Sequence, residues 1–190
     1  MKCNSKLRGI FVAVTALLLL PQAAGSQQGQ HPYAGHEQRP LKALSAQQIA
    51  DLEAGRGMGL ALAAELNGYP GPLHVLELAE PLGLTPAQRE RTQALFEAMK
   101  AQAQALGARL IAAEGALDRQ FAARSVTAAS LRDGVRDVAT LQGDLRATHL
   151  EFHLAVADLL TPQQIARYAA LRGYGQGAPA PPPHQGHGRH

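Results

Sequence analysis

The sequence predicts an all-α protein built around one long antiparallel helical hairpin. Alanine and leucine dominate, aromatic residues make up 4% of the 190 residues, and Trp is absent. This composition leaves few of the residue types that β-sheets favour. Two long stretches carry apolar residues at steps of three and four, which is the spacing of an amphipathic helix. A Leu-Thr-Pro-x-Gln box precedes the first stretch and follows the second.

The two boxes, residues 84–88 and 160–164, are helix starts. Thr is a good N-cap, Pro suits the first helical position, and Gln three residues past the cap closes a capping box. Residues 44–48 form a weaker third copy, in which Ser replaces Thr and Ala replaces Pro. We expect a structural role for both capping pairs, Thr85 with Gln88 and Thr161 with Gln164.

Residues 1–25 have the pattern of a secretory signal peptide. A basic start is followed by an apolar run at 10–20 that is too short to span a bilayer comfortably, and small residues at 23–25 suit cleavage. We therefore expect export to the periplasm, with an uncleaved membrane anchor as the alternative. Residues 26–43 are polar and are expected to form a flexible N-terminal arm.

Removal of the signal peptide changes the charge of the protein. The whole chain has 18 Lys and Arg residues against 15 Asp and Glu, and three of the basic residues lie in the signal. The mature charge is therefore balanced, so the sequence shows no electrostatic footprint for nucleic acid. The only cysteine, Cys3, also leaves, and with it any disulfide or thiol chemistry.

A helical domain is expected over residues 44–173. Its first helix runs from Ser45 to about Leu66 and is interrupted by a glycine cluster at 55–59. That cluster follows no predicted strand and lacks the Lys-Ser/Thr of a phosphate-binding loop, so a break between helices is the better interpretation. A turn at 67–72 leads into a short helix that ends near Gly83.

Two long helices follow, over residues 86–124 and 128–160, with a reversal at 125–127. Each has more than 30 residues and so a length on the order of 45 Å or more. A hairpin this thin cannot bury both apolar stripes alone, so shorter helices or a second copy must cover it. On that basis we predict a homodimer. A short last helix ends at Leu171, and the Gly/Pro/His-rich residues 174–190 are expected to be disordered.

The signal peptide, the two boxes and the hairpin between them together resemble the Spy/CpxP family of bacterial periplasmic proteins. The resemblance covers about residues 72–172. That family includes ATP-independent chaperones, an inhibitor of an envelope-stress sensor kinase, zinc-resistance-associated proteins and nickel- or cobalt-sensing relatives. The resemblance implies an all-α fold, usually a curved dimer whose concave face meets clients. The chaperone members tend to have a positive concave surface, whereas the mature charge here is balanced.

The leading functional hypothesis is a periplasmic, ATP-independent chaperone of the envelope stress response. It would bind unfolded or partly folded envelope proteins through an amphipathic helical surface. The candidate client-binding residues, which the same pattern allows to be core residues, are Leu95, Met99, Leu106 and Leu110. Two alternatives stay open: a heavy-metal sensor or resistance protein, and an adaptor that inhibits a sensor kinase or another membrane-bound regulator.

His149 and His153 are the candidate metal ligands. They stand four residues apart on the second long helix and so project to one side, at a spacing that suits a metal ion such as Zn²⁺, Ni²⁺ or Co²⁺. Leu150 occupies the position where a zinc protease has glutamate, so that class is excluded. The other interpretation is a pair of core histidines. Two imidazoles make half of a tetrahedral site, and the possible further ligands are His74, His31, His36 or a second subunit.

No enzyme is predicted from this sequence. The mature chain has no cysteine nucleophile, its serines stand outside any nucleophile-elbow pattern, and no cofactor is required. A flexible His-rich tail can capture transition metals loosely or can have no function. The tail histidines are His184, His187 and His190.

Overall fold

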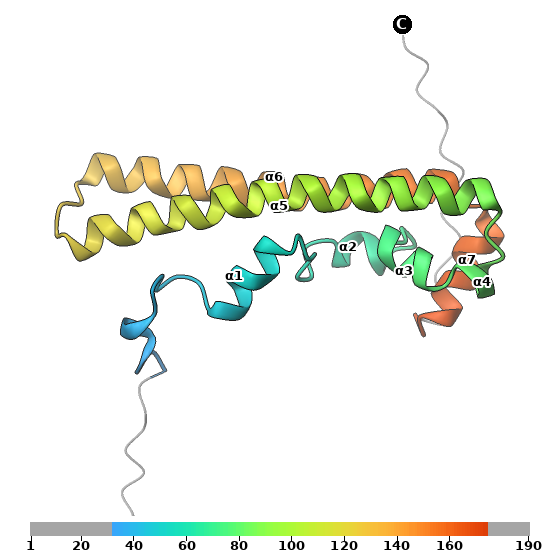
Figure 1. The fold of residues 1–190 in the computed structure, drawn as a ribbon, viewed down its shortest axis with the longest axis horizontal. Coiled ribbons are helices and arrows are strands. Elements are labelled where there is room, and N and C mark those ends of the chain that lie inside the picture. Colours follow the sequence, from blue (N-terminus) through green and yellow to red (C-terminus); the bar gives the residue numbers. More distant parts are fainter. Residues whose placement is uncertain (1–31, 175–190) are drawn as a thin grey trace, which may run out of the picture. The chain divides into compact units, whose positions relative to one another are not determined.

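The computed structural model describes residues 32–174, and every regular element within that range is a helix (Figure 1). The predicted signal peptide, His31, the start of the arm and residues 175–190 with their three histidines lie outside the described residues. No helix between residues 32 and 174 combines the length and the apolar character needed to cross a bilayer.

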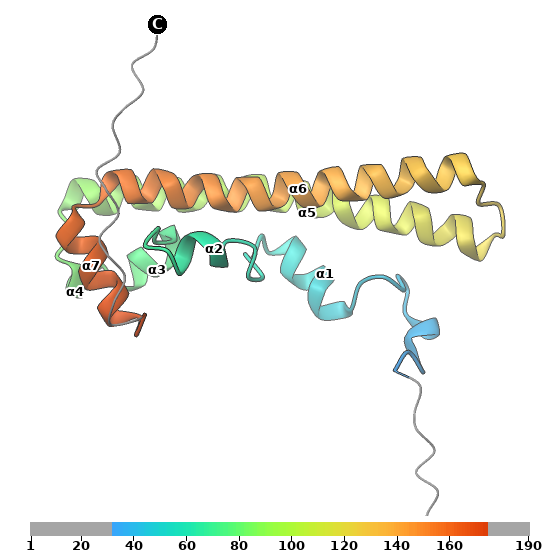
Figure 2. The ribbon, with the colours of Figure 1, turned by 180° about the vertical axis from the view of Figure 1, so that it is seen from behind.

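The predicted helical hairpin is confirmed. Its two long helices, α5 (Pro86–Ala122) and α6 (Ala128–Leu159), lie side by side in both views (Figures 1 and 2). A turn at 123–127 reverses the chain, with Arg124 in the left-handed region at φ 52°. α6 then starts on a capping box of its own, made by Thr127 and Ser130, which the sequence analysis did not identify.

Shorter helices follow one side of the hairpin and one end of it. The expected helix over 45–66 is two helices, separated by residues 54–61, and the expected helix ending near Gly83 is also two, which meet at Leu78. Ser45 and Gln48 form the third predicted capping box. The shorter elements are the 3₁₀ helix η1 (His36–Gln38), α1 (Ala46–Glu53), α2 (Leu62–Glu65), α3 (Pro72–Glu77), α4 (Ala79–Leu82) and α7 (Pro162–Leu171).

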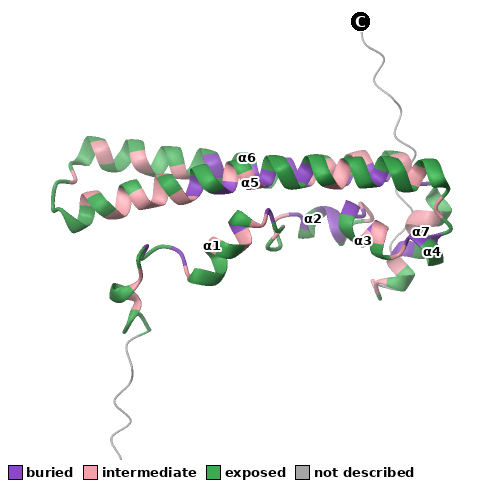
Figure 3. Ribbon diagram, in the orientation of Figure 1, coloured by how far each residue is buried: buried purple, intermediate pink, exposed green. Residues whose placement is uncertain are grey.

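Two apolar clusters form the core. The first joins α1 to the middle of the hairpin and includes Leu52, Ala103 and Leu145; the second joins α3, α4 and α7 to the end of α6 and includes Val75 and Val156. Figure 3 shows the buried residues along the part of the hairpin that the short helices accompany, whereas the part near the reversal is mostly exposed.

The first cluster corrects one predicted boundary. Leu41 was assigned to the flexible arm, but it is buried in the same cluster as Leu44. Burial of an apolar side chain against the hairpin stabilises the fold even when the segment that carries it is mostly polar. The ordered domain therefore begins before residue 44.

The candidate client-binding residues belong to the core of the single chain. Met99 and Leu110 are buried, with 7% and 4% of their surface exposed. Leu95 and Leu106 are half-buried, each against one of the two clusters. They are core residues, as the sequence pattern allowed, because the shorter helices cover the apolar stripe of α5.

The two Leu-Thr-Pro-x-Gln boxes bind each other. Both form the predicted capping boxes, in which Thr85 and Thr161 accept from the backbone of Gln88 and Gln164. The Gln88 side-chain nitrogen also donates to the Gln164 side-chain oxygen at 2.9 Å and to the Leu159 carbonyl at 3.1 Å. The Gln164 nitrogen lies 3.0 Å from the Gln88 oxygen. The repeated box therefore caps two helices and also joins the start of α5 to the end of α6.

Candidate ligand pocket

A pocket of about 550 Å³ lies between the glycine-rich loop after α1 and the hairpin. Segments distant in sequence form its walls: the loop 54–59, the end of α2, the start of α3, the middle of α5, the second half of α6, and the chain after α7. Its polar and charged lining residues are Arg56, Glu65, His74, Lys100, His149, His153, Arg172 and Tyr174. Both predicted metal-ligand candidates on α6 are among them.

His149 is a buried histidine with an unpartnered nitrogen. The residue is 2% exposed, and its Nε2 atom has no hydrogen-bond partner. Burial, together with the nearby His153, lowers the pKa of the His149 imidazole. The ring is therefore neutral near pH 7 and retains the lone pair that a metal ion needs. An unpartnered buried nitrogen costs stability in the folded chain, so a ligand that engages it is favoured.

His153 is oriented by the backbone. Its Nδ1 lies 2.7 Å from the Tyr69 carbonyl oxygen, and since a carbonyl only accepts, Nδ1 carries the proton. In the neutral form of this ring, the lone pair is therefore on Nε2. Metal-binding histidines are commonly held by such a bond from the other nitrogen. Gly71 leaves room beside this ring, because a Cβ atom there would lie 2.9 Å from Nε2.

Glu65 is a buried carboxylate that the sequence analysis missed. It is 7% exposed and accepts hydrogen bonds from the Gly71 backbone N–H at 3.2 Å and from the Tyr168 and Tyr174 hydroxyls. The Arg172 Nε lies 3.6 Å away. Burial and the bond to Glu65 raise the pKa of Tyr168, so its hydroxyl stays a donor. The only sequence signal was an acid at the end of an Ala/Leu-rich segment.

Tyr174 corrects the predicted start of the tail. It was assigned to the disordered tail 174–190, but its hydroxyl lies 2.9 Å from Glu65 and its ring contacts Tyr168. A buried carboxylate needs its donors, and this hydroxyl is one of them. The ordered domain therefore extends at least one residue further.

The remaining predicted ligands are less well placed. His74 lines the same pocket, with its Nδ1 3.0 Å from a Glu77 carboxylate oxygen. His36 belongs to η1 and is not part of this lining, and His31 lies outside the described residues. Between residues 32 and 174, no three His, Cys, Asp or Glu side chains come together as a metal-binding group. The described chain thus offers a metal two imidazoles.

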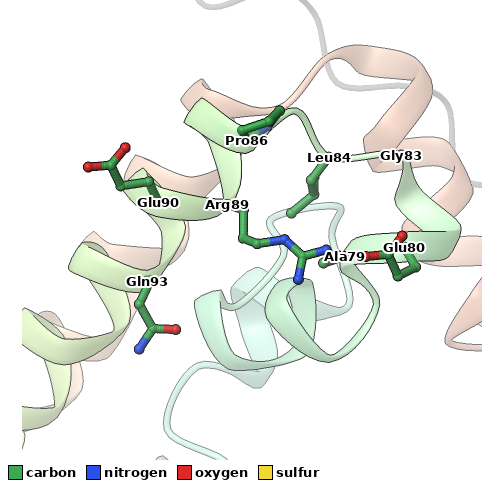
Figure 4. A pocket seen from close by; sticks show the side chains of 8 residues that line it. All are labelled: Ala79, Glu80, Gly83, Leu84, Pro86, Arg89, Glu90 and Gln93. Carbon is green, nitrogen blue, oxygen red and sulfur yellow. Dashed lines mark hydrogen bonds and ion pairs between the residues drawn. The ribbon is translucent and has the colours of Figure 1, made fainter.

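A second pocket, of about 580 Å³, lies between α4 and the start of α5 (Figure 4). In it Arg89 points toward Glu80, with which it forms an ion pair. Both side chains are at least half exposed. Paired charges in contact with water have no unmet need for a ligand. The pocket with His149 and His153 is therefore the stronger candidate for a site.

Comparison with known proteins found no matching family model, no matching curated protein and no matching solved structure. Membership of the Spy/CpxP family therefore stays a prediction from the two boxes and the hairpin.

Proposed function

We propose that this chain is a non-catalytic periplasmic protein that binds a first-row transition metal, Zn²⁺, Ni²⁺ or Co²⁺, at His149 and His153. One observation carries the proposal. Two buried imidazoles line one pocket a helical turn apart, one with an unpartnered nitrogen and the other oriented through its Nδ1. Neutral imidazole is a favoured ligand of all three metals.

A role in sensing or resistance fits the construction of the pocket. Both histidines are on α6, whereas the loop 54–59 and the chain after α7 provide other walls. A ligand held by this pocket favours the folded arrangement of all these segments, since it binds the folded chain and not the unfolded one. At a hundredfold excess over its dissociation constant, it would raise the free energy of unfolding by about 2.7 kcal/mol. A higher metal concentration would thus stabilise the folded arrangement of the pocket walls.

Thermal unfolding of the full chain with and without each metal tests the proposal. The tail histidines are first replaced by serine in every variant (His184→Ser, His187→Ser and His190→Ser), so that loose binding by the tail does not contribute. In that background we expect the metal to raise Tm, and the double variant His149→Gln/His153→Gln to lose the increase. His36→Gln is the matched control outside the pocket. An equal increase in the double variant would refute the proposal, and the metal-free melts report whether the variants fold.

A second candidate function, the chaperone, is favoured by a different observation. The half of the hairpin near the reversal exposes three apolar side chains, Phe121, Leu131 and Val135, at 52%, 37% and 50%. Exposed apolar groups of this kind bind apolar segments of other proteins. The test is suppression of aggregation of a denatured model protein by the wild type and by Phe121→Ser/Val135→Ser. Equal suppression by both would remove this surface from the hypothesis, and none at stoichiometric excess would remove the hypothesis.

The same apolar surface is where a second copy would bind, so the predicted homodimer can be tested with the same variant. Light scattering during size-exclusion chromatography should give a dimer mass for the wild type and a lower mass for Phe121→Ser/Val135→Ser. A wild-type monomer at micromolar concentration would contradict the predicted homodimer.

A further inference from the structure

The pocket is larger and more basic than a site for a metal ion alone requires. Its volume of about 550 Å³ falls in the range of sites for small organic ligands. Its lining contains Arg56, Lys100 and Arg172 in addition to three histidines, against one carboxylate, Glu65. The positive side chains of this wall oppose a bare cation and attract an anion.

The charges of the wall are not equally available. Glu65 already accepts from two tyrosine hydroxyls and a backbone N–H, and Arg56 is paired with Asp51 at 2.5 Å. The Lys100 ammonium, in contrast, has no hydrogen-bond or ion-pair partner among the described residues. It extends from α5, the helix that faces α6 across the hairpin. Arg172 is held by the Tyr174 hydroxyl and by Glu65, so Lys100 is the available cation of the pocket.

The proposed metal site also lacks ligands. Two imidazoles supply half of a tetrahedral sphere and a third of an octahedral one. Glu65 lies 3.8 Å from the Nδ1 of His153, but no three His, Cys, Asp or Glu side chains of residues 32–174 form a metal-binding group. The missing ligands must come from outside the described residues. Carboxylate oxygens bind both these metals and a lysine ammonium. A single small molecule with several carboxylates meets both needs.

We infer that the pocket binds its metal as a chelate with a small polycarboxylate of the citrate class. This inference rests on the proposed function. His149 and His153 bind the metal, the carboxylates complete its coordination, and a free carboxylate pairs with Lys100. The chelate is less positively charged than the bare ion, which suits the basic wall. Apolar side chains, including Phe96 and Met99, also line the pocket and would contact the carbon atoms of the ligand.

Equilibrium dialysis of radiolabelled citrate against the full chain, with and without Ni²⁺, tests the inference. The three tail histidines are again replaced by serine. We expect one citrate per chain to be retained with Ni²⁺ and at least tenfold weaker retention without it. His149→Gln/His153→Gln should abolish the metal-dependent part. Calorimetric titration with Ni²⁺ alone, in a buffer that does not bind the metal, is run in parallel.

Lys100→Gln separates the chelate from the bare metal. Loss of one charge-assisted bond should weaken citrate retention by about tenfold or more, whereas the affinity for Ni²⁺ alone should be equal or higher, because one positive charge is removed from the wall. Arg109→Gln is the matched control, because it removes one positive charge from the same helix outside the pocket lining. It should change neither binding reaction.

The outcomes distinguish the two proposals. If Ni²⁺ binds and citrate is not retained, or if Lys100→Gln retains as much citrate as the wild type, the chelate inference is overturned and the metal site stands. If citrate is retained equally without Ni²⁺, the pocket is an anion site and the chelate inference falls. If neither Ni²⁺ nor its citrate complex binds, both proposals fall.

Discussion

Gly107 marks a close approach of α1 to the hairpin. A Cβ atom at this position of α5 would lie 2.5 Å from the Leu52 carbonyl oxygen and 3.0 Å from its carbonyl carbon. These are backbone atoms of α1 and cannot rotate away as the end of a side chain can. The substitution Gly107→Ala must therefore displace α1 from α5.

Two opposing effects set the magnitude. Alanine in a helix interior is favoured over glycine by about 1 kcal/mol. Against this, displacement of α1 disturbs Leu52, which is 3% exposed, and the 3.0 Å bond from Gln104 to the Glu53 carbonyl. Insertion of atoms into a close contact costs about 1–3 kcal/mol. Gly143 of α6 is the matched control, because a Cβ there meets nothing within 4 Å.

Gly143→Ala should therefore raise the free energy of unfolding by about 1 kcal/mol, and Gly107→Ala should be about 1–3 kcal/mol less stable than Gly143→Ala. Urea unfolding followed by far-UV circular dichroism measures both, since the chain has no Trp for fluorescence. If the free energy of unfolding falls with urea concentration at the same slope in the wild type and both variants, the same transition is being compared. If Gly107→Ala proves as stable as Gly143→Ala, the close contact between α1 and α5 described above is refuted.

Three other predictions concern the caps and the pocket. Gln88→Ala and Gln164→Ala should each lower the free energy of unfolding by about 1–2 kcal/mol. The double variant should lose less than the sum of the two, because the two side chains share hydrogen bonds. Additive losses, measured by urea unfolding, would contradict this. Because burial lowers the pKa of His149 in the folded chain, the unfolded chain binds that proton more readily, so stability should fall as the pH drops below about 6.5. The urea midpoint of His149→Gln should fall less than that of the wild type over the same pH range. Equal falls in the two proteins would contradict the assignment of this pH dependence to His149. Gly71→Ala should weaken metal binding, because the added Cβ would crowd Nε2 of His153. The extended backbone at 71 itself accepts alanine. If the metal titration is unchanged, the metal does not bind on this side of the His153 ring.

The long helices and their caps could be predicted because their signals are local. Steps of three and four define a helix face, and a capping box needs residues only three positions apart. The structure confirms Thr85 with Gln88 and Thr161 with Gln164 as caps. The bonds between Gln88 and Gln164 join residues 76 positions apart, and no local pattern predicts them.

The histidine pair could be predicted from its spacing, but its surroundings could not. Glu65 meets Tyr168 and Tyr174 across 103 and 109 positions of sequence. Tyr174 was assigned to the tail because Gly and Pro surround it. Composition describes the average of a segment, whereas one hydroxyl bound to a buried carboxylate is enough to fix the end of a domain.

Two glycine-containing segments, at 55–59 and 67–72, were interpreted only as a break and a turn, and both also shape the pocket. Gly57 lies opposite His149, where a Cβ would stand 3.7 Å from the ring, and Gly71 lies opposite His153, where it would stand 2.9 Å away. Each imidazole on α6 thus faces a residue without a side chain. A chain that needed only to reverse direction could use other turn residues at 71, where the backbone is extended and glycine is not required. The space beside His153 is therefore the physical reason for glycine at this position, and it links the turn to the binding of a ligand.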